Sequence, residues 1–184
     1  MYKLFNFIIK VKRKESFAIG SIKNEGKWLR KLNKYGIGPR LYYFNKKFLI
    51  CEFINGDRIL NYFKKCSLNE RRKVVKEVLR QCYVLDKLKV DKFEMHHPLK
   101  HVIIGKKIAF LWKRNVSERK TMVTMIDFER CKYSSKPKNV TGFCQFLNNY
   151  YKKVDSDKLR EILKKYKESY SNGDFDKLSL LFCD

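Results

Sequence analysis

The stretch Met125-Ile126-Asp127-Phe128-Glu129 places an acidic residue at the end of an apolar strand, directly before an aromatic residue. A carboxylate at such a strand-to-loop corner can hold a magnesium ion that bridges nucleotide phosphates. The same letters also fit a buried strand that ends in Asp before a turn. The order of the elements that precede this stretch therefore decides how it is interpreted.

The composition predicts a packed globule. The 184 residues suffice for one well-filled domain or two small lobes, and 44% of them are hydrophobic and 15% aromatic. The six cysteines include no C-x-x-C pair, which favours reduced, buried thiols. No stretch approaches the ~20 uninterrupted apolar residues of a membrane span, and the start lacks the architecture of a signal peptide. We therefore expect a soluble cytoplasmic protein that does not enter a membrane.

The formal net charge of +24 predicts attraction to anions, whether nucleic acid, acidic protein or nucleotide phosphates. The basic residues are spread along the chain, with short runs at residues 10–14 and 71–73. This distribution is typical of a solvated surface, with RNA or DNA binding as the main alternative. Four aromatic residues could stack on bases, but their spacing is more typical of a hairpin core; they are Tyr42, Tyr43, Phe44 and Phe48.

The first third of the chain predicts β-rich structure. Residues 5–11 are apolar and β-branched enough for a strand, and residues 24–35 follow a helical pattern that Gly36 ends. Residues 41–44 and 48–53 form two apolar runs with the pattern of a β-hairpin. Asn55-Gly56-Asp57 then breaks the chain and divides residues 1–55 from a mainly helical remainder.

The remainder opens with Ser67-Leu68-Asn69-Glu70, a capping box that begins a long helix. Residues 102–104 and 108–112 predict strands separated by a turn at Gly105-Lys106-Lys107, and residues 113–120 predict a loop before the strand 122–126. Thr141 can cap a helix through residue 151. A final amphipathic helix is predicted to end at Asn172-Gly173.

Four runs in this order resemble the small archaeal-type serine/threonine protein kinases, a kinase-like family related to the RIO and lipopolysaccharide kinases. The runs are Gly36-Ile37-Gly38-Pro39, Pro98-Leu99-Lys100-His101-Val102, Ile126-Asp127-Phe128-Glu129-Arg130 and Pro137-Lys138-Asn139-Val140-Thr141. The resemblance covers residues 8–147 and implies an α+β, two-lobed kinase-like fold. Residues 1–55 would form a truncated β-rich N-lobe, and residues 56–184 a mainly helical C-lobe of the same domain.

The resemblance also implies a site for ATP and Mg²⁺. Lys10 matches the strand lysine that contacts the nucleotide phosphates, and Glu25 matches the acid that holds this lysine in place. The backbone of Glu52 and Ile54 would meet the adenine edge. The residues themselves allow simpler readings, because Lys10 is one of 43 basic residues and Glu25 is a favourable acid in a first helical turn.

The catalytic and metal positions follow in the same way. Asp127 matches the metal-binding aspartate, and Glu94 takes the place of the catalytic aspartate that accepts the proton of the substrate hydroxyl. His101 stands where an asparagine would bind a second magnesium. A neutral imidazole is a poor ligand for this hard ion, so one Mg²⁺ is expected. The alternatives are a surface Glu94, a His101 packed at the base of a strand and an Asp127 that caps a turn.

The sequence departs from the kinase pattern at two places. No G-x-G-x-x-G run precedes Lys10, where nine residues are too few for two strands and a phosphate-covering loop. Glu129 stands where ordinary kinases have glycine. The leading hypothesis is transfer of the ATP γ-phosphoryl to a hydroxyl of a protein or another acceptor. The alternatives are a weakly active or inactive pseudokinase that acts as a binding module, and a basic RNA-binding protein.

Overall fold

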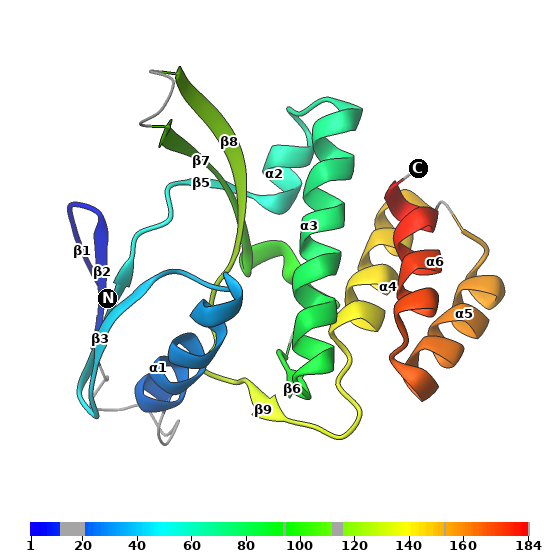
Figure 1. Cartoon of the computed structure of the whole chain (residues 1–184), viewed down its shortest axis with the longest axis horizontal. Coiled ribbons are helices and arrows are strands. Elements are labelled where there is room, and N and C mark those ends of the chain that lie inside the picture. The colour runs from blue at the N-terminus through cyan, green and yellow to red at the C-terminus, as the bar shows by residue number, and fades with distance from the viewer. Residues whose placement is uncertain (12–20, 94, 112–115, 153, 184) are drawn as a thin grey trace. The chain divides into compact units, whose positions relative to one another are not determined.

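The computed structural model describes residues 1–11, 21–93, 95–111, 116–152 and 154–183 (Figure 1). The chain divides into two compact units. Unit 1 contains residues 1–65 and 100–129, and unit 2 contains residues 66–99 and 130–184. In the described part of the chain, no helix combines the length and the apolar character that crossing a membrane requires.

Unit 1 begins with a four-stranded antiparallel sheet in the order β1-β2-β4-β3. Its strands are β1 (Tyr2–Leu4), β2 (Phe7–Val11), β3 (Leu41–Phe44) and β4 (Phe48–Glu52). The predicted strand at residues 5–11 is shorter in the structure, because residues 5 and 6 turn the chain between β1 and β2. The hairpin predicted for residues 41–53 is the pair β3 and β4.

Helix α1 (Ser21–Leu32) packs against β3 and β4 and continues into the 3₁₀ turn η1 (Asn33–Tyr35). Its inner face buries Trp28, Leu29 and Leu32. Gly26 allows the helix to lie close to the sheet, because a Cβ at this position would overlap the ring of Phe44 on β3. The neighbouring residue, Glu25, is buried.

A second antiparallel sheet of unit 1 has the order β5-β7-β8. Its strands are β5 (Gly56–Arg58), β7 (Val102–Leu111) and β8 (Val116–Met125), and the short helix α2 (Ile59–Phe63) follows β5. The turn predicted at residues 105–107 is wrong, because β7 runs through it. A Cβ at Gly105 would lie 2.7 Å from the carbonyl oxygen of Asn55, so this glycine permits a close strand approach rather than a turn.

The same sheet corrects two further expectations. Residues 56–58 stand where the sequence predicts a break before the mainly helical remainder, but they form β5 and pair with residues 103–105 of β7. Residues 116–120 of the predicted loop belong to β8. Residues 112–115 lie outside the described part of the chain.

Unit 2 is mainly helical. It contains α3 (Leu68–Lys87), α4 (Asn139–Tyr151), α5 (Ser156–Ser169) and α6 (Asn172–Cys183), with β6 (Val90–Asp91) paired to β9 (Lys132–Tyr133). The 3₁₀ turn η2 (Pro98–Lys100) stands at a boundary between the units. The capping box of α3 is confirmed, since Ser67 Oγ accepts from the Glu70 amide at 3.3 Å and the Glu70 carboxylate accepts from the Ser67 amide at 2.9 Å. Five α3 residues at helical spacing are buried as expected: Val75, Val78, Leu79, Cys82 and Leu85.

The predicted end of the last helix is wrong. Helix α5 ends at Ser169, and Asn172-Gly173 begins α6 instead. The local reason is a second cap: Ser171 Oγ accepts from the Asp174 amide at 3.1 Å and donates to the Asp174 carboxylate at 2.7 Å. A serine followed three residues later by an acid marks a helix start, and this signal outweighs the glycine.

Candidate functional site

Lys10 and Glu25 form an ion pair in unit 1. Lys10 lies on β2, and its Nζ is 2.7 Å from Oε1 and 3.0 Å from Oε2 of Glu25 on α1. The Glu25 side chain is only 2% exposed, whereas that of Lys10 is 21% exposed. A buried carboxylate is stable only with a partner, so the lysine stabilises the acid and the acid fixes the position of the amine.

Asp127 joins this pair from the other end of unit 1. Its Oδ1 lies 3.0 Å from Lys10 Nζ, across a separation of 117 residues. The residue stands two positions after β8 and has a φ of 61°. Aspartate tolerates this left-handed conformation better than most residues. Phe128 is fully buried next to it and anchors the corner that presents the carboxylate.

His101 contacts the second oxygen of the same carboxylate. Its Nδ1 is 3.4 Å from Asp127 Oδ2. The two residues meet because the Ile126 amide donates to the His101 carbonyl at 2.9 Å, which continues the pairing of β7 with β8. The structure thus places His101 beside the metal-binding candidate, where it can orient the aspartate.

The electrostatics of this cluster keep Lys10 and Asp127 charged at neutral pH. The hydrogen bond from His101 and the charge of Lys10 hold the pKa of Asp127 well below its usual range, although burial opposes them. Burial lowers the pKa of Lys10, but Glu25 and Asp127 outweigh it and raise that pKa above its usual range. The site therefore presents an ammonium group between two carboxylates.

These residues fit a magnesium ion bound together with a nucleotide. Asp127 is ionised and 41% exposed, and Mg²⁺ is commonly held by one or two carboxylates together with phosphate oxygens. The Lys10 ammonium, partly exposed beside it, is a point charge suited to phosphate oxygens.

The predicted adenine-contacting segment follows β4. The Glu52 carboxylate accepts from the Arg40 amide at 3.3 Å, and the Phe53 amide donates to the Asn6 carbonyl at 2.8 Å. The Phe53 amide is therefore bonded within unit 1. The predicted contact with adenine would involve the next backbone amide along the chain, that of Ile54. Both Glu52 and Ile54 are partly exposed, and their contact with adenine stays a prediction. Glu94 lies outside the described residues.

Asn24 makes a further contact that was not predicted from the sequence. Its Nδ2 donates to the Glu129 carbonyl at 2.7 Å and ties α1 to the chain just after Asp127. This bond joins residues that are 105 positions apart. Only the pairing of the two segments in space reveals it.

A second network holds residues 90–92 in unit 2, just before the predicted catalytic position. Asn139 Nδ2 donates to the Val90 carbonyl at 2.6 Å and to Asp86 Oδ1 at 2.7 Å, while its Oδ1 accepts from the Lys92 amide at 2.8 Å. Tyr166 Oη donates to Asp86 Oδ2 at 2.9 Å. The network is buried and positions the backbone that leads to Glu94.

The whole chain is similar in fold to solved protein kinases. It aligns with the Rio2 kinase from Chaetomium thermophilum at a TM-score of 0.54 and 8% identity, covering 95% of this chain and 55% of that one. It aligns with the Rad53 kinase domain at a TM-score of 0.54 and 15% identity, covering 97% of this chain and 76% of that one. The chain thus spans about half of the Rio2 structure. No family model and no curated protein matches the chain.

The likeness to both kinases confirms the predicted fold class. The chain has an α+β fold like that of these two protein kinases, with a small β-rich part and a mainly helical part.

Proposed function

We propose that this chain is an ATP-dependent phosphotransferase that moves the γ-phosphoryl group of Mg-ATP to a hydroxyl, in the manner of a serine/threonine kinase. The observation that carries the proposal is the contact of Lys10 Nζ with both Glu25 and Asp127, at 2.7 and 3.0 Å. These residues come from three separate segments of unit 1. A kinase site needs this lysine, its acidic partner and the metal-binding aspartate together.

Each side chain has a distinct role in the proposal. Lys10 binds phosphate oxygens, Glu25 orients Lys10, and Asp127 binds the magnesium ion. A magnesium ion held by Asp127 would offset the charge that develops on the phosphate oxygens. His101 holds the second oxygen of Asp127 and so orients the carboxylate. Glu94 accepts the hydroxyl proton.

The adenine edge is proposed to meet the backbone of Glu52 and Ile54. Nucleotide binding also has to change the contacts of Lys10. An ammonium group has three donors, and Lys10 directs them at two oxygens of Glu25 and one of Asp127. We therefore expect the bond from Lys10 to Asp127 to give way to a phosphate oxygen, while the bonds to the buried Glu25 persist.

Thermal melting with and without Mg-ATP tests the proposal. A ligand at 100 times its dissociation constant adds about 2.7 kcal/mol to the free energy of unfolding. For a chain of this size the midpoint should rise by roughly 5–11 °C. Asp127→Asn should lose the magnesium-dependent part of this rise, because asparagine tolerates the same backbone conformation but lacks the charge. Asp57→Asn, at an exposed carboxylate of the same unit, is the matched control and should keep the full rise.

The same preparation distinguishes the alternatives. A magnesium-dependent rise without ATP turnover would assign the chain to the inactive pseudokinases. No rise for the wild type, or an equal rise for Asp127→Asn, would contradict the proposed site. An RNA-binding protein would instead show polynucleotide affinity that falls by several decades between low and moderate salt.

A further inference from the structure

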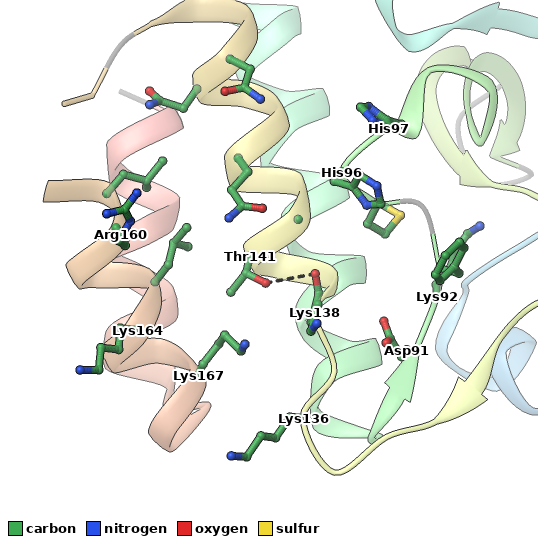
Figure 2. A pocket seen from close by; sticks show the side chains of 18 of the residues that line it. Asp91, Lys92, His96, His97, Lys136, Lys138, Thr141, Arg160, Lys164 and Lys167 are labelled. Atoms are coloured by element: carbon green, nitrogen blue, oxygen red, sulfur yellow. Dashed lines mark hydrogen bonds between the residues drawn. The ribbon is translucent and has the colours of Figure 1, made fainter. Parts of the chain in front are cut away.

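Unit 2 contains a groove of about 1360 Å³. It lies between α4, α5 and the segments around β6 and β9 (Figure 2). All of its lining residues belong to unit 2, whereas Lys10, Glu25, His101 and Asp127 belong to unit 1. Its volume exceeds the roughly 300–1,000 Å³ of small-molecule pockets. The groove therefore suits a segment of a polymer better than a small ligand.

The charge of the groove is strongly positive. Among the described lining residues, seven are lysine or arginine and two are acidic. The basic ones are Lys92, Lys132, Lys136, Lys138, Arg160, Lys164 and Lys167. A concave surface lined by one sign of charge concentrates ligands of the opposite sign.

The basic side chains line two sides of the groove. Arg160, Lys164 and Lys167 follow one face of α5 at helical spacing. Figure 2 shows Lys167 extending from α5 toward the loop that carries Lys136 and Lys138. An extended chain between them can meet cations on both sides.

The loop opposite α5 is held in place by its own hydrogen bonds. The Lys136 amide donates to Ser134 Oγ at 3.2 Å, and Thr141 Oγ1 donates to the Lys138 carbonyl at 3.2 Å (Figure 2). The Tyr170 hydroxyl donates to the Pro137 carbonyl at 3.0 Å. Lys136 and Lys138 thus extend from a backbone that is already ordered, and this order lowers the entropy lost on binding.

We propose that this groove binds an acidic segment of another polypeptide, rich in aspartate or glutamate. The uncharged part of the lining favours a peptide over a nucleic acid. Single-stranded nucleic acids are held by basic residues together with aromatic rings on which the bases stack. Within the described lining, the aromatic rings are those of Phe93 and of His96 and His97, and the two imidazole rings contact each other at 4.5 Å between centroids. Gln145 and Asn149 of α4 offer amides that can pair with a peptide backbone.

Fluorescence anisotropy on the full chain tests the proposal. The probe is a labelled peptide of alternating glutamate and serine, compared with the same peptide carrying glutamine. The double variant Lys136→Glu, Lys167→Glu reverses one charge on each side of the groove. Two reversals within several ångströms of carboxylates should weaken binding of the glutamate peptide about tenfold or more at low salt.

Lys158→Glu, Lys165→Glu is the matched control. Both lysines are exposed on α5 and lie outside the groove lining, so this variant carries the same net charge and should bind within about twofold of wild type. Melting curves of both variants verify that each is folded. Equal weakening by the two variants, or equal binding of the glutamate and glutamine peptides, would overturn the proposal. A groove variant that loses more affinity for single-stranded poly(U) than for the peptide would overturn it in favour of nucleic acid.

Discussion

At the scale of single residues, the candidate site depends on how one cation is shared. Lys10 stabilises the buried Glu25 and also contacts Asp127, which is open to solvent. The same ammonium group therefore stabilises one buried partner, and in the proposed function it binds phosphate beside the other, exposed partner. Its two carboxylate partners differ in exposure, 2% against 41%, and this difference separates the two roles.

Lys10→Met should lower the free energy of unfolding by about 2–4 kcal/mol, because it leaves the Glu25 carboxylate buried without its cation. The value is set somewhat below the cost of breaking a fully buried pair, since Lys10 is partly exposed. Adding Glu25→Gln should recover at least half of the loss, because the uncompensated charge is then gone. Urea denaturation of the two single variants and the double variant measures this coupling.

Lys46→Met removes an exposed lysine from the turn between β3 and β4 and is the control. It should change the free energy of unfolding by less than about 0.5 kcal/mol. A double variant as unstable as Lys10→Met alone would show that the uncompensated charge of Glu25 is not the cause of the loss.

At the scale of elements, α4 begins on a carboxylate that another helix supplies. Asp86 of α3 accepts from the Asn139 amide at 3.1 Å and from the Val140 amide at 3.2 Å, the first amides of α4. Helix starts leave such amides without intrahelical partners. Burial raises the pKa of Asp86 to about 6, even though these bonds and those of the Asn139 and Tyr166 side chains lower it. The contact between α3 and α4 is therefore sensitive to pH.

Asp86 should contribute to the free energy of unfolding, and this contribution should fall as pH rises. The pKa of Asp86 is about 6 in the fold and 3.8 for an ordinary aspartate. Between these values the folded chain binds more protons, so Asp86 stabilises it below the lower value and loses that contribution as pH rises through about 6. The slope is at most about 1.4 kcal/mol per pH unit.

Chemical denaturation of wild type and Asp86→Asn measures this contribution. The experiment runs from about pH 4 to about pH 7, roughly the window set by these pKa values. The asparagine variant should be less stable throughout, because it cannot accept all of the same hydrogen bonds. Its stability should nevertheless decline less with rising pH than that of wild type. Parallel curves for the two proteins would show that Asp86 does not titrate in this window.

At the scale of the whole molecule, the excess of positive charge makes repulsion between like charges the main long-range interaction. The net charge of +24 is distributed over both units. Such a chain repels itself in the folded state. Added salt screens this repulsion, with a Debye length of about 10 Å at 0.1 M.

The melting midpoint should therefore rise by at least about 2 °C between low salt and roughly 0.5 M sodium chloride. Differential scanning calorimetry across this range, repeated with potassium chloride to exclude an effect specific to sodium, is the measurement. Exposed ion pairs such as Arg80 with Glu77 weaken in salt. A midpoint that falls with salt would show that these pairs outweigh the net repulsion.

Local signals in the sequence determined much of the helical part. The capping box at Ser67 and Glu70 and the spacing of buried residues in α3 depend on contacts within one helix, so they can be predicted from neighbouring letters. The resemblance to kinases placed Lys10, Glu25 and Asp127 in one site, and the structure brings these side chains within hydrogen-bond distance.

Tertiary structure decided the features that depend on segments far apart in the chain. Gly105 lies in a strand because β5 approaches it closely, and His101 contacts Asp127 because β7 and β8 end together. Asn139 holds residues 90–92 from 47 positions away. Such contacts depend on which backbone segments meet in space. The residues that flank a glycine or an asparagine in the sequence do not indicate its distant partner. The sequence by itself therefore determined elements held by local contacts, such as the capped helix α3 and the hairpin of β3 and β4. The packing of distant strands and helices decided which side chains meet.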